Sequence, residues 1–369
     1  MSHPKSNPRT LRLLGELMAE AEEERKERVQ EERFHSLELY ELLLEEGRAA
    51  LPFEPRRANE LATLGAELGV RLGERGMLAP EAESEGLSRA LCLTATARRL
   101  VGDVDAAEAL LERAQCLTLE AAGRGRFCRA LGLLRWDQGR IPEAVALLHH
   151  GLLLFGQARK GREEAACRAL LGLLHVEEGE AERGAPLLQR ACRALERADE
   201  AWLAARCGLG LALCFAAAGE PEKAKRARES AWKLYGGVRN EDALFALYWM
   251  EGRVAAGAGE ATEAGHLLEA VRRKLIARRL LPEATLATID LGLVLTELGR
   301  GGEVSAHVEE LAARFEGRPG LDLALGALAT YAEDAAAGRL DRHLWTRLAP
   351  ELRLAFRLQG VGLSPVPFA

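Results

Sequence analysis

The chain has 369 residues, 48% of them hydrophobic, which is enough apolar material for a sizeable core. Its formal net charge is −6, so its overall electrostatics do not favour nucleic acid as a partner. The N-terminus lacks the apolar core and cleavage site of a signal peptide, and the longest apolar run, GLGLALCFAAAG at 208–219, is too short to span a bilayer. These features predict a cytoplasmic protein that does not bind membranes.

The N-terminal region is predicted to be helical after a loose tail at residues 1–8. The segment AEAEEERKERVQEER, residues 19–33, alternates both charge signs at i, i+4 spacing and has almost no apolar residues. It is interpreted as a solvated helix or linker within one helical stretch at 9–49. The alternative is a docking helix or coiled-coil arm, although apolar a and d positions are absent. Residues 1–33 are therefore predicted to form a tail and a charged helix.

An apolar helical face begins in the next segment, FHSLELYELLLEEGRAAL, at residues 34–51. The sequence LPFEP at 51–55 breaks that helix, and a second helix is expected at 56–76. The region 34–82 is predicted to be a pair of leading helices or a degenerate repeat.

A glycine then recurs with a nearly constant period, at spacings of 37, 40, 40, 40, 40 and 39 residues. Each copy lies just beyond an apolar helical segment, where glycine ends a helix because it enters the left-handed conformation without a Cβ clash. Proline or an acidic residue follows and favours the first turn of a second helix. A fixed period near 40 indicates stacked helix–turn–helix repeats. The glycines are Gly102, Gly139, Gly179, Gly219, Gly259, Gly299 and Gly338.

Seven helix pairs follow from this period. The first helices are predicted at 83–101, 124–138, 162–178, 200–218, 240–258, 282–298 and 320–337. The second helices are predicted at 104–120, 141–157, 181–197, 221–236, 261–278, 302–316 and 341–358.

Small residues occupy fixed places on both helices of a pair. Position −7 from the turn glycine carries Ala95, Gly132, Gly172, Ala212, Gly252 and Gly292, and only Tyr331 breaks the series. Alanine or glycine also stands five residues after the glycine in the first five copies. Small side chains let the two backbones approach, and Leu148, Leu188 and Leu268 are expected to fill the remaining space.

These columns resemble the tetratricopeptide repeat (TPR), whose pattern is small at position 8, glycine at the turn, alanine at 20 and small at 27. Position 27 here is Ala114, Gly151, Ala191 and Ala231. The resemblance covers residues 83–340 and implies an all-α, right-handed solenoid of about seven repeats behind the N-terminal helical extension. The period is nearer 40 than 34, as in long-repeat bacterial regulatory and scaffold proteins. The last copy loses its small residues, which is typical of a capping repeat, so 341–369 is expected to be a capping helix and tail.

No catalytic motif is evident. The eight histidines show no HExxH and no Cys/His ligand spacing, and neither a phosphate-binding loop nor GxSxG occurs. The seven cysteines form no CxxC and are interpreted as reduced, buried apolar residues, with a redox pair as the alternative. We therefore expect no enzyme activity, no cofactor and no metal.

The resemblance implies that the first helices line a concave groove. Position −13 from the turn glycine carries Arg89, Arg126 and Arg206, and position −10 carries Arg129 and Trp249, with Trp136 at −3. Arginine binds carboxylates through two parallel hydrogen bonds, and buried aromatic residues anchor interfaces. This pattern predicts an acidic partner segment. The alternative is that these arginines pair with acids such as Asp137, Glu177 and Glu251.

The groove's C-terminal half is apolar except for Asp290. A polar residue there should have a partner, and Arg253 on the preceding first helix is the expected one. The pair is interpreted as an inter-repeat ion pair, with partner recognition as the alternative.

The predicted function is a non-catalytic scaffold or adaptor that holds a peptide or helix of a protein partner in its groove. One alternative is a regulatory or sensor subunit that controls a transcription factor, a protease or another effector. Another is self-association, in which the apolar groove around Leu286, Ile289 and Leu325 receives the chain's own N-terminal helix or its VPFA tail.

Overall fold

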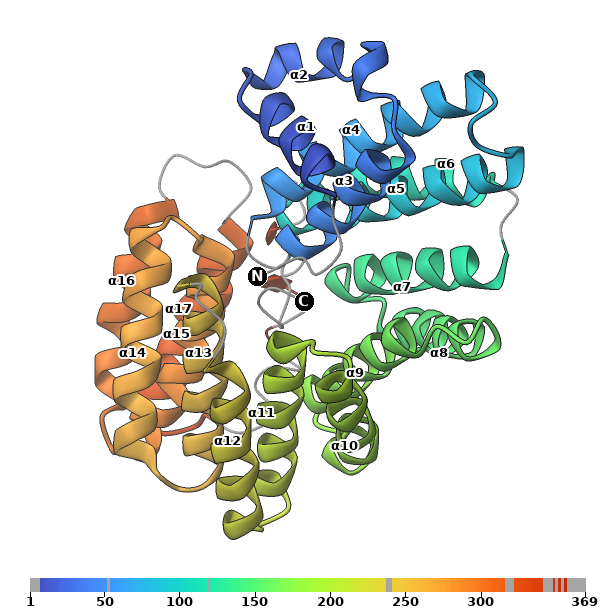
Figure 1. Cartoon of the computed structure of the whole chain (residues 1–369). Coiled ribbons are helices and arrows are strands. Elements are labelled where there is room, and N and C mark those ends of the chain that lie inside the picture. The colour runs from blue at the N-terminus through green and yellow to red at the C-terminus, as the bar shows by residue number, and fades with distance from the viewer. Residues whose placement is uncertain are drawn as a thin grey trace.

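The computed structural model describes residues 7–51, 54–117, 120–236, 241–315 and 322–340, together with 348, 351–352 and 355–356. Within these residues the fold is all-helical, with no β-strand. Helix pairs follow one another around a curve in Figure 1, with the first helix of each pair on the inside and the second on the outside. The predicted all-α solenoid is confirmed.

Six complete pairs are described, along with the first helix of a seventh. The first helices are α5 (Pro80–Leu100), α7 (Ala121–Asp137), α9 (Gly161–Glu177), α11 (Ala201–Ala217), α13 (Glu241–Gly257), α15 (Leu281–Glu297) and α17 (Asp322–Ala336). The second helices are α6 (Val104–Gln115), α8 (Ile141–Gln157), α10 (Ala181–Arg197), α12 (Pro221–Tyr235), α14 (Ala261–Ala277) and α16 (Val304–Phe315), the last preceded by the 3₁₀ helix η2 (Gly301–Glu303). Most of the predicted helix at 341–358, and the VPFA tail, lie outside the described residues.

The turn between the two helices of each pair is built as expected. Each of the seven recurring glycines has a positive φ, between 66° and 87°. At Gly139, for example, the amide of Gly139 donates to Trp136 and the amide of Arg140 donates to Arg135, which satisfies carbonyls at the end of α7. The turns between pairs also use positive φ, but at Arg159, Asp199 and Arg279.

The small-residue columns let the paired helices approach closely. A Cβ placed on Gly132, Gly172 or Gly252 would lie only 2.8–3.1 Å from the leucine nine residues beyond the turn glycine. Those leucines, Leu148, Leu188 and Leu268, are fully buried. The predicted combination of a small residue facing a large one is therefore the packing rule of the array.

The N-terminal region differs from the single helical stretch predicted at 9–49. It consists of α1 (Pro8–Met18), α2 (Glu22–Arg28), the 3₁₀ helix η1 (Glu32–Phe34) and α3 (Leu37–Ala50). The charged segment is neither a continuous helix nor a projecting arm. It folds back on α4 (Pro55–Glu74), where Arg25 pairs with Glu60 and Arg75 pairs with Glu32. These tertiary ion pairs override the local helical preference of the charge pattern.

All seven cysteines are free thiols. Five are buried, Cys192 is partly buried and Cys116 is exposed, so burial was correctly predicted for most of them and wrong for Cys116. Burial raises the pKa of Cys92 and of Cys167 to about 12, which keeps these thiols protonated.

Replacing Gly179 with alanine should lower the free energy of unfolding by about 1 kcal/mol, because the left-handed conformation is costly for a residue with a Cβ. No atom lies within 4 Å of the added Cβ, so the cost is that of the backbone alone. Gly161, at the other end of α9, has equally open space and an ordinary φ. Gly161→Ala is the matched control and should be neutral or stabilising in urea unfolding. Equal destabilisation by both changes would contradict this account of the turn.

Candidate functional site

A cavity of about 230 Å³ opens on the inner side of the first half of the solenoid. Helices α3, α5, α7, α9 and α11 each contribute to its wall, and Figure 1 shows how these helices are arranged. Two glutamates, Glu45 and Glu163, and six arginines line it: Arg48, Arg89, Arg126, Arg129, Arg162 and Arg206. These eight side chains carry a formal net charge of +4 (six positive, two negative) inside a chain whose net charge is −6.

The four arginines predicted from the −13 and −10 positions come together in this cavity. Arg89 lies on α5, Arg126 and Arg129 on α7, and Arg206 on α11. Stacking of repeats with a period near 40 places equivalent positions beside one another, which is why residues so far apart in sequence share one wall.

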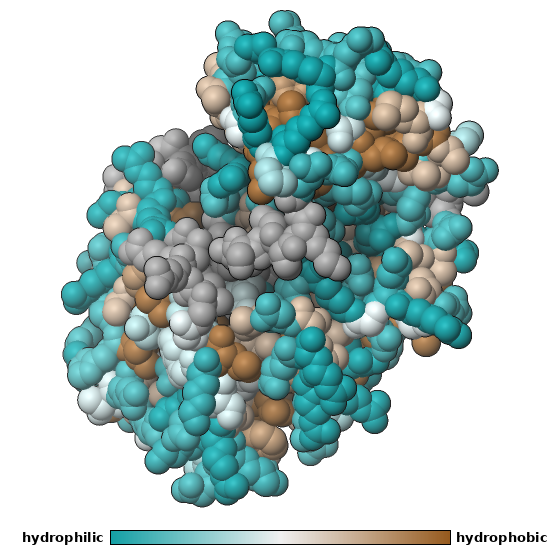
Figure 2. Space-filling view, in the orientation of Figure 1, coloured by the Kyte–Doolittle hydropathy of each residue, from teal (hydrophilic) through white to brown (hydrophobic). Residues whose placement is uncertain are grey.

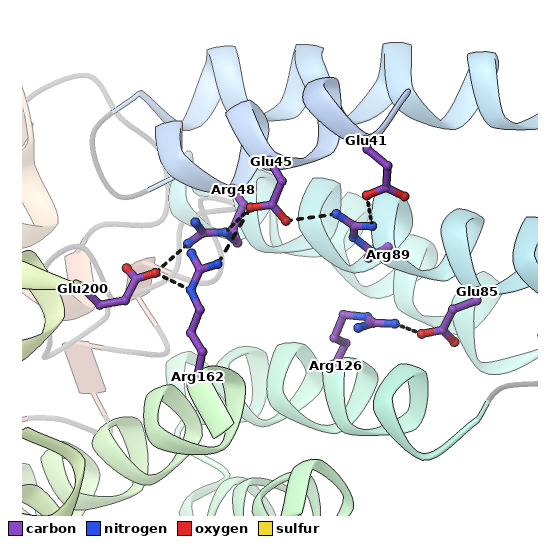
Figure 3. A network of polar contacts seen from close by, with 8 residues as sticks. All are labelled: Glu41, Glu45, Arg48, Glu85, Arg89, Arg126, Arg162 and Glu200. Carbon is purple, nitrogen blue, oxygen red and sulfur yellow. Dashed lines mark hydrogen bonds and ion pairs between the residues drawn. The ribbon is translucent and has the colours of Figure 1, made fainter. Parts of the chain in front are cut away.

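Two of these arginines are held by neighbouring carboxylates (Figure 3). Arg89 donates to Glu41 Oε2 at 2.7 Å and to Glu45 Oε1 at 3.1 Å. Arg126 forms an ion pair with Glu85, but its Nε is buried and has no hydrogen-bond partner in the described part of the chain. Burial and the positive charge of Arg129 both lower the pKa of Arg126. An anion beside these two guanidinium groups would offset both effects.

Arg129 is differently placed. Its guanidinium carbon lies 5.6 Å from the centroid of the Phe155 ring, and no ion pair joins it to a carboxylate of the described residues. Its charge is therefore the one in the cavity that is most available to a bound carboxylate.

Arg206 lies at the bottom of the wall, with only 2% of its surface exposed. Its guanidinium carbon is 5.7 Å from the centroid of Trp202, another lining residue. Burial lowers the pKa of Arg206 to about 10, so it remains protonated at neutral pH. Arg206 therefore adds to the positive potential of the cavity, although its side chain is buried in the wall.

The sequence analysis missed position −17, one helical turn before −13. This position carries Glu85, Arg162 and Trp202, which bind Arg126 or line the cavity. Residues four apart share one helix face, so the i−4 rule could have found them. Glu45 and Arg48 lie on α3, outside the repeat, and no periodic signal could have placed them here.

The two tryptophans proposed for the groove are core residues instead. Trp136 has no exposed surface, and Trp249 is 3% exposed. Position −3, which Trp136 shares with the buried Arg99, faces the packing between helices rather than the cavity. Trp249 Nε1 donates to Asp290 at 2.7 Å. The prediction of an aromatic surface beside the arginines was therefore wrong for these two residues.

Arg253 and Asp290 form a separate, partly buried cluster. The Nε of Arg253 lies 3.8 Å from Asp290 Oδ2, which confirms the predicted inter-repeat pair, and its Nη1 donates to Glu177 at 2.6 Å. Burial raises the pKa of both Asp290 and Glu177. Burial also opposes the Arg253 charge, but the two carboxylates outweigh it and raise the pKa of Arg253.

The apolar half of the predicted groove is closed by its own packing. Leu286 and Ile289 are buried in the C-terminal core, and Leu325 packs against that core. Helix α1 packs on α3 rather than into this region. The interpretation of these three residues as a receptor for the chain's own N-terminal helix was therefore wrong, and the alternative occupant, the VPFA tail, lies outside the described residues.

The face drawn in Figure 2 is mostly hydrophilic, with smaller hydrophobic patches between the charged side chains. The described residues include no group of three or more histidine, cysteine or acidic side chains able to hold a metal ion. None of the helices in the described segments is long and apolar enough to cross a membrane.

No protein-family model matches the chain, and no curated protein matches its sequence. Solved structures do match. A Rap protein in complex with competence and sporulation factor is 14% identical over 87% of this chain and 88% of its own, with a TM-score of 0.63. The fold is that of a TPR-like solenoid.

Two structures of the quorum sensor NprR show the same fold. The apo form from B. thuringiensis is 15% identical, covers 85% of this chain and 89% of its own, and has a TM-score of 0.55. NprR in complex with its cognate peptide NprX is 14% identical, covers 86% of this chain and 92% of its own, and has a TM-score of 0.56. At these identities the likeness concerns the fold.

Proposed function

We propose that this protein is a non-catalytic, peptide-binding protein whose arginine-lined cavity holds an acidic segment of its ligand. The observation that carries the proposal is the convergence of six arginines on one concave cavity, where Arg129 has no ion pair with a carboxylate of the described residues. Charge-assisted, bidentate hydrogen bonds from arginine are the usual means of holding carboxylates.

The size of the cavity fits this ligand. Sites for whole small molecules usually measure about 300–1,000 Å³, so 230 Å³ suits one or two residues of a longer segment. The apolar lining residues Leu93, Leu133 and Leu170 offer contacts to an aliphatic side chain next to the acidic group.

The solved structures with a similar fold favour a regulatory role over a purely structural one. NprR is a quorum sensor with a cognate peptide, and the Rap structure holds competence and sporulation factor. By analogy, the ligand here would be a peptide signal or a peptide segment of an effector protein, acting inside the cytoplasm.

Selection from a random peptide library on the immobilised protein tests the proposal. Enriched peptides are expected to contain aspartate or glutamate well above the composition of the library. They should not be retained by the Arg126→Glu/Arg129→Glu variant. The Arg190→Glu/Arg193→Glu variant is the matched control, because it reverses two exposed arginines at the same spacing on the outer helix α10. Enrichment without acidic residues, or equal retention by the cavity variant, would refute the proposal.

A further inference from the structure

Four charged side chains join the N-terminal helices to the middle of the array at the edge of the cavity. Glu200 pairs with Arg162 of α9 and lies 3.4 Å from Arg48 Nη1 of α3. Glu45, on α3, lies 3.0 Å from Arg48 Nε and 3.9 Å from Arg162 Nη1. Figure 3 shows this Glu45–Arg48–Arg162–Glu200 cluster, which we call the clasp, bridging helices from the two sides.

The clasp links α3 directly to α9 and to the start of α11. Helix α3 packs against α1, α4 and α5, but the described residues give it no comparable helix packing against α9 or α11. Glu200 immediately precedes α11 and is 152 residues from Arg48. The contact therefore closes a long loop of the fold through side chains alone.

The clasp is also weak enough to open. Its side chains are between 26% and 44% exposed, so water and salt screen their attraction. Arg48 and Arg162 share both carboxylates, and loss of Glu200 would leave two positive charges facing Glu45 alone. The charge of Glu200 therefore decides whether attraction or repulsion dominates among the side chains of the clasp.

The clasp and the cavity use the same side chains. Glu45, Arg48 and Arg162 line the cavity, and Glu45 also accepts a hydrogen bond from Arg89. A carboxylate entering the cavity would compete with Glu45 and Glu200 for these arginines. The carboxylates of the clasp thus stand where acidic groups of a ligand would bind.

We propose that the clasp is a ligand-sensitive latch, which an acidic ligand opens by taking Arg48 and Arg162 from Glu200 and Glu45. The proposal rests on the proposed function for the acidity of the ligand. Opening frees α3, with the helices packed on it, from α9 and α11. Because coupling is reciprocal, a change that opens the latch and keeps both arginines must also strengthen ligand binding.

Glu200→Gln in the full-length protein tests the latch, with pentaglutamate as the acidic probe. Hydrogen–deuterium exchange should become faster in α3 and in the first turn of α11 without any ligand. Saturating pentaglutamate should produce the same change in the wild type. The variant should bind pentaglutamate about two- to tenfold more tightly. Glu303→Gln is the control, because it removes an exposed carboxylate whose ion pair among the described residues is with Arg300.

Glu200→Gln could change exchange in α11 only because Glu200 directly precedes that helix. Arg48→Gln excludes this explanation, because it opens the clasp from the α3 side. It should accelerate exchange in the same segments. Binding of pentaglutamate by the Glu200→Gln variant alone would also support the latch. Pentaglutamate binding with unchanged exchange in α3 and α11 would overturn the latch while leaving the proposed function intact. Failure of both the wild type and the variant to bind pentaglutamate would overturn both proposals.

Discussion

Replacing Arg129 with glutamate should weaken binding of an acidic peptide about 100-fold. The change removes a charge-assisted hydrogen bond, worth about 1.5–3 kcal/mol, and adds repulsion between two carboxylates. Arg129 has no carboxylate partner in the described chain, so its substitution should leave no buried acid unpaired. Isothermal titration with an acidic peptide from the selection measures the effect.

Arg129→Lys separates charge from geometry. Lysine keeps the positive charge but loses the planar pair of donors, so an intermediate loss of about tenfold is expected. The thermal midpoints of both variants should stay close to that of the wild type, because Arg129 is only partly buried. Unchanged peptide affinity in Arg129→Glu would show that this arginine takes no part in binding.

Replacing Asp137 with alanine should lower the free energy of unfolding by about 3–5 kcal/mol, because it removes the carboxylate that pairs with the buried guanidinium of Arg99. Asp137 Oδ2 accepts from Arg99 Nη1 at 2.7 Å, and the two side chains are 3% and 2% exposed. They join α5 to α7 across neighbouring repeats. Urea unfolding monitored by circular dichroism, with hydrogen exchange in α7 as a local measure, checks the effect.

Two further variants make this prediction specific. Arg99→Met/Asp137→Leu should recover part of the loss, because apolar side chains can replace a buried ion pair at little cost. Arg140→Ala removes one member of an exposed pair with Glu143 and should cost no more than about 1 kcal/mol. A small effect of Asp137→Ala, comparable to that of Arg140→Ala, would contradict the assigned role of the buried pair.

The repeat was predictable because its rules are local. A turn glycine, an acidic or proline-containing first turn, and small residues facing leucines act within about 20 residues of chain. The predicted bounds of the first helices therefore agree closely with α7, α9, α11 and α15. Pairing of Arg253 with Asp290 was also predictable, because neighbouring repeats place equivalent faces side by side.

The errors arose where non-local contacts decide the outcome. The charge pattern of residues 19–33 predicted one solvated helix. In the structure, ion pairs hold this segment against α4. Trp136 lies at position −3 from its turn glycine. The repeat period alone does not show that side chains at this position face the core. Glu45 and Arg48 of α3 meet Glu200 and Arg162 at the cavity, although these residues are more than 100 positions away in sequence.

The central claim is that the arginine-lined cavity binds the acidic segment of a peptide ligand. Its most direct test is titration of one selected peptide into the wild type, Arg126→Glu/Arg129→Glu and Arg190→Glu/Arg193→Glu. The account predicts wild-type affinity for the outer-helix variant and a loss of at least about 100-fold for the cavity variant. Equal affinities for all three proteins, with the fold intact by circular dichroism, would contradict it.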